Sequence, residues 1–153
     1  MKKVKKYKNS YKVFFIYKDN NEQLAEESIW ADKEGDFYRV KNIPFFTNNI
    51  AYNDLISVEI DDVLYFDSLI EESGHSTVQL VFFDMEYFDH LTNTIIEMGC
   101  SWEGSHLKEY ISIDVPKNCD FKKVKLFLEL GLSDGKWDYK EACISEFHRN
   151  TLS

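Results

Sequence analysis

The stretch TVQLVFF, residues 77–83, decides the fold of the second half of the chain, because it ends where a helical pattern begins. It is a β-rich run, and Asp84 comes directly after it as a residue suited to begin a helix. Apolar residues then recur on one helical face, and Gly99 suits the end of that helix; the face consists of Phe88, Leu91, Ile95 and Met98. The sequence therefore predicts a strand followed by a helix.

The rest of this half repeats the pattern in a different order. SWEGSH (101–106) and EYISIDVP (109–116) predict two strands, and Asp120 begins a second helix that Gly131 is expected to end. Residues 137–144 alternate as a final strand. The order from 77 to about 145 is thus β-α-β-β-α-β, which is that of ferredoxin-like folds.

The first half of the chain shows strand patterns and no helical period. Strands are expected at 11–18, within 28–43 around a turn at KEGD, and at 54–60 and 63–70 around Asp61-Asp62. In 54–60 the residues expected to be buried are Ile56, Val58 and Ile60. We predict an α+β protein, with a β-rich, barrel-like subdomain at 1–73, a ferredoxin-like subdomain at 74–153, and both forming one compact unit.

Composition limits the class of protein. The chain has 153 residues, enough to bury a core without metals or disulfides. It has no apolar stretch of the roughly 20 residues that span a membrane, and VFFI (13–16) is too short for a secretory signal. Cys100, Cys119 and Cys143 lack metal-binding spacing and are expected to be reduced thiols. We expect a cytoplasmic protein with no membrane partner, no metal and no cofactor.

Charge is distributed unevenly along the chain. Residues 1–18 carry seven Lys and no acidic residue, and this Lys-rich arm is interpreted as a frayed terminus leading into an edge strand. Residues 42–107 contain no Lys or Arg but twelve carboxylates. Such a segment projects a negative field, which repels nucleic acid and attracts basic proteins.

Several motifs in order resemble one protein family. They are SIWA (28–31), GDFYRVKNIPFF (35–46), IAYNDLISVEI (50–60) and ESGHSTVQL (72–80), with IDVP (113–116) and GKWDYKEA (135–142) later. The chain resembles the bacterial domain of unknown function family 4265, in which Tyr52-Asn53-Asp54 matches a tyrosine-Gly-Asp turn. Such domains are similar to immunity proteins encoded beside secreted toxins. The resemblance therefore implies a protein that binds and neutralises a toxin.

ESGHST (72–77) is the segment that most resembles a catalytic site. An enzyme would use His75 as a base, Ser76 or Thr77 as a nucleophile, and Glu71 or Glu72 as the orienting acid. Adjacent strand residues point to opposite faces, however, and no oxyanion-hole motif is present. We therefore favour a turn in which Gly74 takes the left-handed conformation.

The leading hypothesis is a non-catalytic immunity protein that occludes the active site of a basic toxin. Its binding face is predicted to contain seven carboxylates and one of two aromatic anchors, from the set Asp54, Glu59, Asp61, Asp62, Asp67, Glu71, Glu72, Phe45 and Phe46. The alternatives are a small hydrolase that uses His75 and a ligand-binding or regulatory module with a pocket between its two halves. A homodimer through exposed edge strands is also possible.

Overall fold

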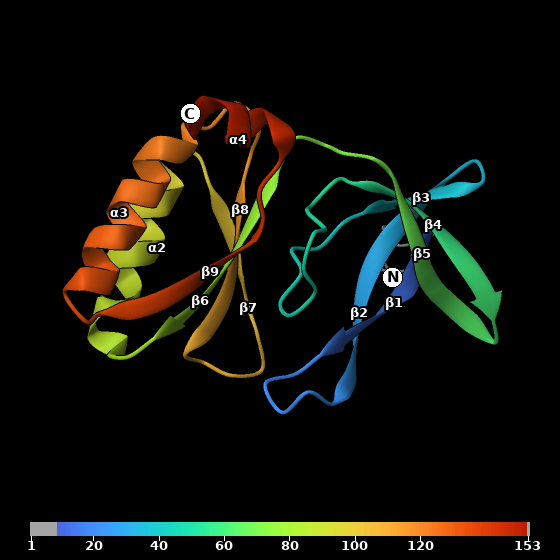
Figure 1. Ribbon diagram of the computed structural model, residues 1–153, viewed down its shortest axis with the longest axis horizontal. Helices are drawn as coiled ribbons and strands as arrows, with labels where there is room; N and C mark the ends of the chain where they lie inside the picture. Colours follow the sequence, from blue (N-terminus) through green and yellow to red (C-terminus); the bar gives the residue numbers. More distant parts are fainter. Residues whose placement is uncertain (1–8, 153) are drawn as a thin grey trace, which may run out of the picture.

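The computed structural model describes residues 9–152 and consists of two β-structured halves side by side (Figure 1). Of the seven lysines in the predicted Lys-rich arm, Lys12 and Lys18 belong to the first strand. The other five lie outside the described residues.

The first half is a closed barrel of five strands. They are β1 (Ser10–Lys18), β2 (Leu24–Glu34), β3 (Phe37–Val40), β4 (Leu55–Asp61) and β5 (Val63–Glu71). Successive strands pair antiparallel, and a short parallel contact of β1 with β5, at Val13–Leu64 and Phe14–Tyr65, closes the barrel. Alternating apolar side chains fill the interior, among them Val13, Phe15, Ile29, Val40 and Ile56.

The second half is a four-stranded antiparallel sheet with the order β7-β8-β6-β9. Its elements are β6 (Ser76–Phe82), the 3₁₀ turn η1 (Met85–Tyr87), α2 (Phe88–Glu97), β7 (Ser101–Gly104), β8 (Tyr110–Val115), α3 (Phe121–Ser133), β9 (Trp137–Cys143) and α4 (Glu146–Leu152). Helices α2 and α3 cover one face of the sheet (Figure 1), and that interface is apolar. The predicted α+β class and ferredoxin-like order are confirmed.

Two local expectations were wrong, and one helix was missed. Helix α3 does not end at Gly131 but continues to Ser133. Gly131 lies inside the helix, where the Trp137 ring packs so closely that a Cβ would not fit. Helix α4 was not predicted. Ile60, expected to be buried, is 79% exposed because the β4–β5 hairpin extends beyond the barrel interior.

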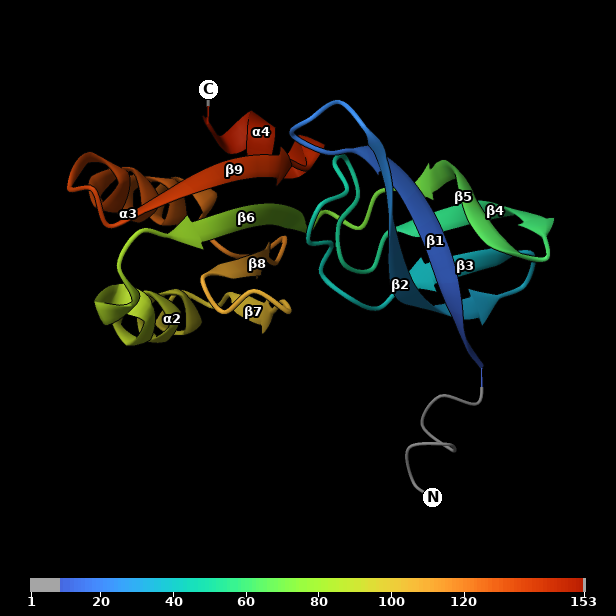
Figure 2. The same ribbon diagram turned by 90° about the horizontal axis from the view of Figure 1, so that it is seen from below.

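An irregular segment, residues 41–54, lies between the two halves, as both ribbon views show (Figures 1 and 2). Buried backbone without regular structure needs hydrogen-bond partners from elsewhere. The face of the second sheet opposite the helices supplies them: Thr77 donates to Ile50 O, and Ser112 donates to Ile43 O. This face is therefore polar although it is buried.

Two carboxylates hold the same segment from opposite sides. Glu27 of β2 accepts hydrogen bonds from the backbone N–H groups of Phe45, Phe46 and Thr47, and also from the Thr47 hydroxyl. Glu103 of β7 accepts one from the Ile43 N–H at 3.0 Å. Since one carboxylate belongs to each half, segment 41–54 connects the barrel to the second sheet.

Candidate functional site

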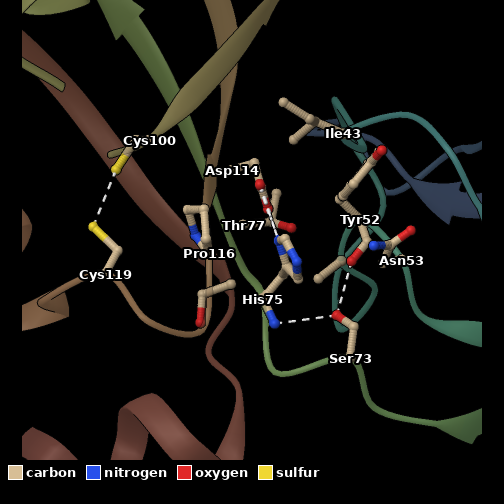
Figure 3. Close-up of polar contacts among 12 residues, drawn as sticks. Ile43, Tyr52, Asn53, Ser73, His75, Thr77, Cys100, Asp114, Pro116 and Cys119 are labelled. Atoms are coloured by element: carbon tan, nitrogen blue, oxygen red, sulfur yellow. Dashed lines mark hydrogen bonds and ion pairs between the residues drawn. The ribbon is translucent and has the colours of Figure 1, made fainter. Parts of the chain in front are cut away.

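The ESGHST segment forms the turn that leads from the barrel into β6. Gly74 has φ +95°, a left-handed conformation that glycine adopts at low cost. The Ser73 hydroxyl donates to Tyr52 O at 2.8 Å and accepts from the His75 N–H at 3.1 Å (Figure 3). These contacts fix the backbone on both sides of the glycine.

His75 is held by a partner that the sequence analysis did not identify. Its Nδ1 lies 2.9 Å from Oδ1 of Asp114, a residue on β8 (Figure 3). Burial raises the pKa of Asp114, and the hydrogen bond from His75 opposes that rise. The proposed acids have other partners: Glu72 accepts the Glu146 N–H, and Glu71 lies 3.6 Å from Arg39 Nη1.

Ser76, the candidate nucleophile, belongs to a buried network. Its Oγ lies 2.6 Å from Nδ1 of His148 on α4 and accepts a hydrogen bond from the Ser145 N–H. The other ring nitrogen of His148 lies 3.0 Å from Pro116 O. Ser76 and His148 are both fully buried. This arrangement joins α4 to the sheet and gives the hydroxyl no access to a substrate.

The two candidate aromatic anchors lie in segment 41–54 between the halves. Phe46 stacks on Tyr17 at a centroid distance of 5.4 Å and on Tyr110 at 5.2 Å. Phe45 contacts Phe46, and its carbonyl accepts a hydrogen bond from the Tyr110 hydroxyl. Both rings are half-buried. They therefore pack at the junction of the two halves, apart from the β4–β5 hairpin.

The prediction that Asp54 belongs to the acidic binding face was wrong, because this residue is fully buried. Its carboxylate accepts hydrogen bonds from the backbone N–H groups of Ala51 and Ser73, both at 2.9 Å. Burial raises its pKa, and these hydrogen bonds oppose the rise. The preceding Asn53 has φ +69°, the conformation expected for the turn. Asp54 therefore stabilises a turn and faces no partner.

The other six predicted carboxylates are exposed on the β4–β5 hairpin and the residue after it. They are Glu59, Asp61, Asp62, Asp67, Glu71 and Glu72. Asp62 makes the tight turn with φ +63°, and the hairpin points away from the second half (Figure 1). Within residues 9–152, no Lys or Arg forms an ion pair with the first four of them. We call this surface the acidic hairpin.

The cysteines are free thiols. Cys100 and Cys143 are buried, and burial raises the pKa of Cys143 to about 12. The Cys100 and Cys119 sulfurs lie 3.8 Å apart (Figure 3). The Cys119 thiol donates to Met98 O. Among the described residues, no cluster of His, Cys, Asp or Glu has the geometry of a metal site, and no helix is long and apolar enough to span a membrane.

A hollow of about 330 Å³ opens between the halves and is called the seam hollow. Its walls come from the end of β1, from Phe46, from the polar face of the second sheet and from β9. A second hollow of about 290 Å³ lies beside His75, between Arg39, Lys41 and Glu71. The ligand-binding hypothesis predicted an apolar pocket between the halves, whereas charged side chains line the seam hollow beside its aromatic rings.

The fold and these sites define an α+β protein in which a small barrel is joined to a ferredoxin-like sheet. The family model described as "Domain of unknown function (DUF4265)" matches residues 27–139, and the chain belongs to that family. It is also similar to a solved structure, a hypothetical protein from Neisseria gonorrhoeae, with 28% identity and a TM-score of 0.82. The match covers 89% of this chain and 96% of that one. No curated protein matches the sequence.

Proposed function

We propose that this protein is a non-catalytic bacterial immunity protein of the cytoplasm, which binds a secreted toxin domain and blocks its active site through the acidic hairpin. The observation that carries the proposal is the clustering of six exposed carboxylates on one hairpin, inside a segment without Lys or Arg. A surface of one sign steers a partner of the opposite sign and speeds their encounter.

The hairpin also presents apolar side chains among its acids. Ile60 is 79% exposed between Glu59 and Asp61, and Ile70 is 44% exposed. An aliphatic side chain surrounded by carboxylates suits a basic cleft with an apolar floor, because interfaces combine a desolvated anchor with a polar rim. Ile60 therefore replaces Phe45 and Phe46 as the proposed anchor.

A protection assay with matched charge variants tests this proposal. Cells would express a basic toxin domain as candidate partner together with the wild-type chain, with Glu59→Lys/Asp61→Lys/Asp62→Lys, or with Glu86→Lys/Asp89→Lys/Glu97→Lys. Both triple variants change the net charge equally and replace exposed residues. The hairpin variant should lose protection and associate more slowly, while the control variant on the helical side should still protect. Equal protection by both would contradict the proposal.

A single substitution tests the anchor separately. Ile60→Ala removes an exposed side chain, so the fold should keep its stability within about 0.5 kcal/mol. If Ile60 is a buried anchor in the complex, its loss should weaken toxin binding by roughly tenfold or more. Unchanged affinity would reject Ile60 as the anchor. The charge variants would still test whether the carboxylates of the acidic hairpin attract the toxin.

A further inference from the structure

The seam hollow contains a polar side chain with an unused hydrogen-bonding atom. Gln79 of β6 is 3% exposed and lines this hollow. Its Nε2 donates to Pro44 O at 3.3 Å and to Thr47 O at 3.1 Å, which fixes the orientation of the amide. In the part of the chain that the structure describes, Oε1 accepts no hydrogen bond. This oxygen still has access to solvent. Oε1 is therefore an open acceptor in the hollow.

The aromatic side of the hollow is rigid and apolar. The rings of Tyr17, Phe46 and Tyr110 form a continuous stack with interplanar angles of 16° and 20°. The Tyr110 hydroxyl is held by a hydrogen bond to Phe45 O, and burial raises its pKa to about 12. Both tyrosines remain neutral at physiological pH, since burial also raises the pKa of Tyr17. A planar ring is the ligand group that such a wall favours.

The rim of the hollow carries ammonium groups as well as carboxylates. Lys18 and Lys140 stand at the rim with Asp19 and Asp138. The two acids are engaged by backbone N–H groups, Asp19 by those of Asn21 and Gln23 and Asp138 by that of Tyr139. Lys140 forms no ion pair among residues 9–152, and the Lys18 ammonium is 4.0 Å from Glu22. The Lys140 ammonium group is thus able to bind an anion, and Lys18 would exchange a long ion pair with Glu22 for that contact.

We propose that the seam hollow binds a nucleoside monophosphate. The heteroaromatic base would lie against the stacked rings and donate an N–H to Gln79 Oε1, and the phosphate would bind Lys18 and Lys140. The volume lies at the lower end of the range of small-molecule sites, about 300–1,000 Å³, so a mononucleotide suits it better than a larger ligand. This site is separate from the acidic hairpin and does not depend on the proposed function.

NMR titration of the ¹⁵N-labelled full chain tests the proposal, with AMP, GMP, CMP and UMP as probes and inorganic phosphate as a reference. At least one nucleotide should give saturable shifts at Phe46, Gln79 and Lys140. Inorganic phosphate should perturb only the lysine rim. If no nucleotide gives saturable shifts at millimolar concentration, or if phosphate alone reproduces the full pattern, the proposal is overturned.

Two variants separate the base from the phosphate contacts. Lys18→Ala/Lys140→Ala changes only exposed side chains and should weaken nucleotide binding roughly tenfold while leaving the nucleoside unaffected. Val81→Phe adds a bulky ring at a residue that lines the hollow and should abolish binding of both ligands. The thermal midpoint of each variant checks its fold. Undiminished binding to a folded Val81→Phe variant would place the ligand elsewhere and reject the site.

Discussion

The Nδ1 atom of His75 lies 2.9 Å from Oδ1 and 3.0 Å from Oδ2 of Asp114, so one imidazole nitrogen faces both oxygens of a buried carboxylate. The pair links the turn after the barrel to the middle strands of the second sheet. A buried carboxylate without such a partner loses its hydration, and no hydrogen bond or opposite charge compensates for that loss.

Replacing His75 by Ala should therefore destabilise the fold by about 1–3 kcal/mol at neutral pH. The folded-state pKa of Asp114 should also rise further above its unfolded value, because a lowering contribution is lost. A raised folded pKa gives stability below the unfolded value, about 3.9 for Asp, and that stability is lost as pH rises through the folded pKa. The variant should thus lose stability more steeply than the wild type as pH rises above about 4.

Urea unfolding at several pH values measures this effect. His106→Ala is the matched control, because His106 is exposed. Equal unfolding free energies for His75→Ala and wild type at pH 7 would show that the His75–Asp114 contact contributes nothing to stability.

The carboxylate of Glu27 should hold the backbone of segment 41–54 in its observed conformation. Glu27→Gln replaces one carboxylate oxygen by an amide NH₂, which cannot accept a hydrogen bond. Either the Phe45 N–H or the N–H groups of Phe46 and Thr47 then lose their acceptor. We expect a loss of about 1.5–3 kcal/mol, the range for hydrogen bonds to charged groups. Amide hydrogen exchange at these three residues should accelerate most.

The exposed neighbour Glu26 provides the comparison. Glu26→Gln should change stability by no more than about 0.5 kcal/mol and leave exchange in the segment unaltered. If Glu27→Gln slowed exchange, or if both variants behaved alike, Glu27 would not hold the segment.

Much of the fold follows from local sequence patterns. The helical spacing of Phe88, Leu91 and Ile95 identified α2, because that helix buries one face. The β-rich composition of TVQLVFF identified β6, which is buried on both faces. Helix α4 has only seven residues, too few for a clear period, and depends on the buried contacts of His148. Pairing of β1 with β5 joins residues about fifty positions apart, which no local pattern reports.

The candidate sites were predicted less completely. Exposure of the hairpin acids followed from their position around a turn. Asp54 is also an aspartate, but its carboxylate binds two backbone N–H groups and is buried. Likewise, Glu27 stands in a charged run, EE at 26–27, and nothing local distinguishes it from Glu26. Such roles depend on tertiary contacts with segments distant in sequence, so a single sequence carries no direct signal for them.

Gly131 should tolerate no side chain. A Cβ at this position would lie 1.9 Å from Cζ2 of Trp137, whose indole N–H donates to Leu128 O and cannot move freely. Gly131→Ala should therefore destabilise the protein by about 3 kcal/mol or more, the upper range for overpacking, and alter Trp fluorescence. Gly135→Ala is the control: it has open space but a φ of +73°, so its cost should stay near 1 kcal/mol. An undisturbed Gly131→Ala variant would contradict the packing of Trp137 against α3.

His148 should make stability depend on pH in the opposite direction to Asp114. Burial lowers its pKa, and the neutral ring already satisfies both nitrogens by accepting from Ser76 Oγ and donating to Pro116 O. Because the folded pKa lies below the unfolded value of about 6.5, the unfolded chain binds more protons as pH falls. The contribution of His148 is thus present above about pH 6.5 and is lost below it.

The variant His148→Asn offers an acceptor in place of Nδ1 but cannot be protonated, so it isolates this effect. Calorimetry should show a lower Tm than wild type at pH 7.5, because the contact with Pro116 O is lost. The Tm difference between wild type and variant should then shrink toward pH 5.5, where only the wild type loses the contribution of a neutral histidine. His106→Asn should show no such convergence, since His106 is exposed. A Tm difference that stays constant over this pH range would mean that protonation of His148 does not oppose folding.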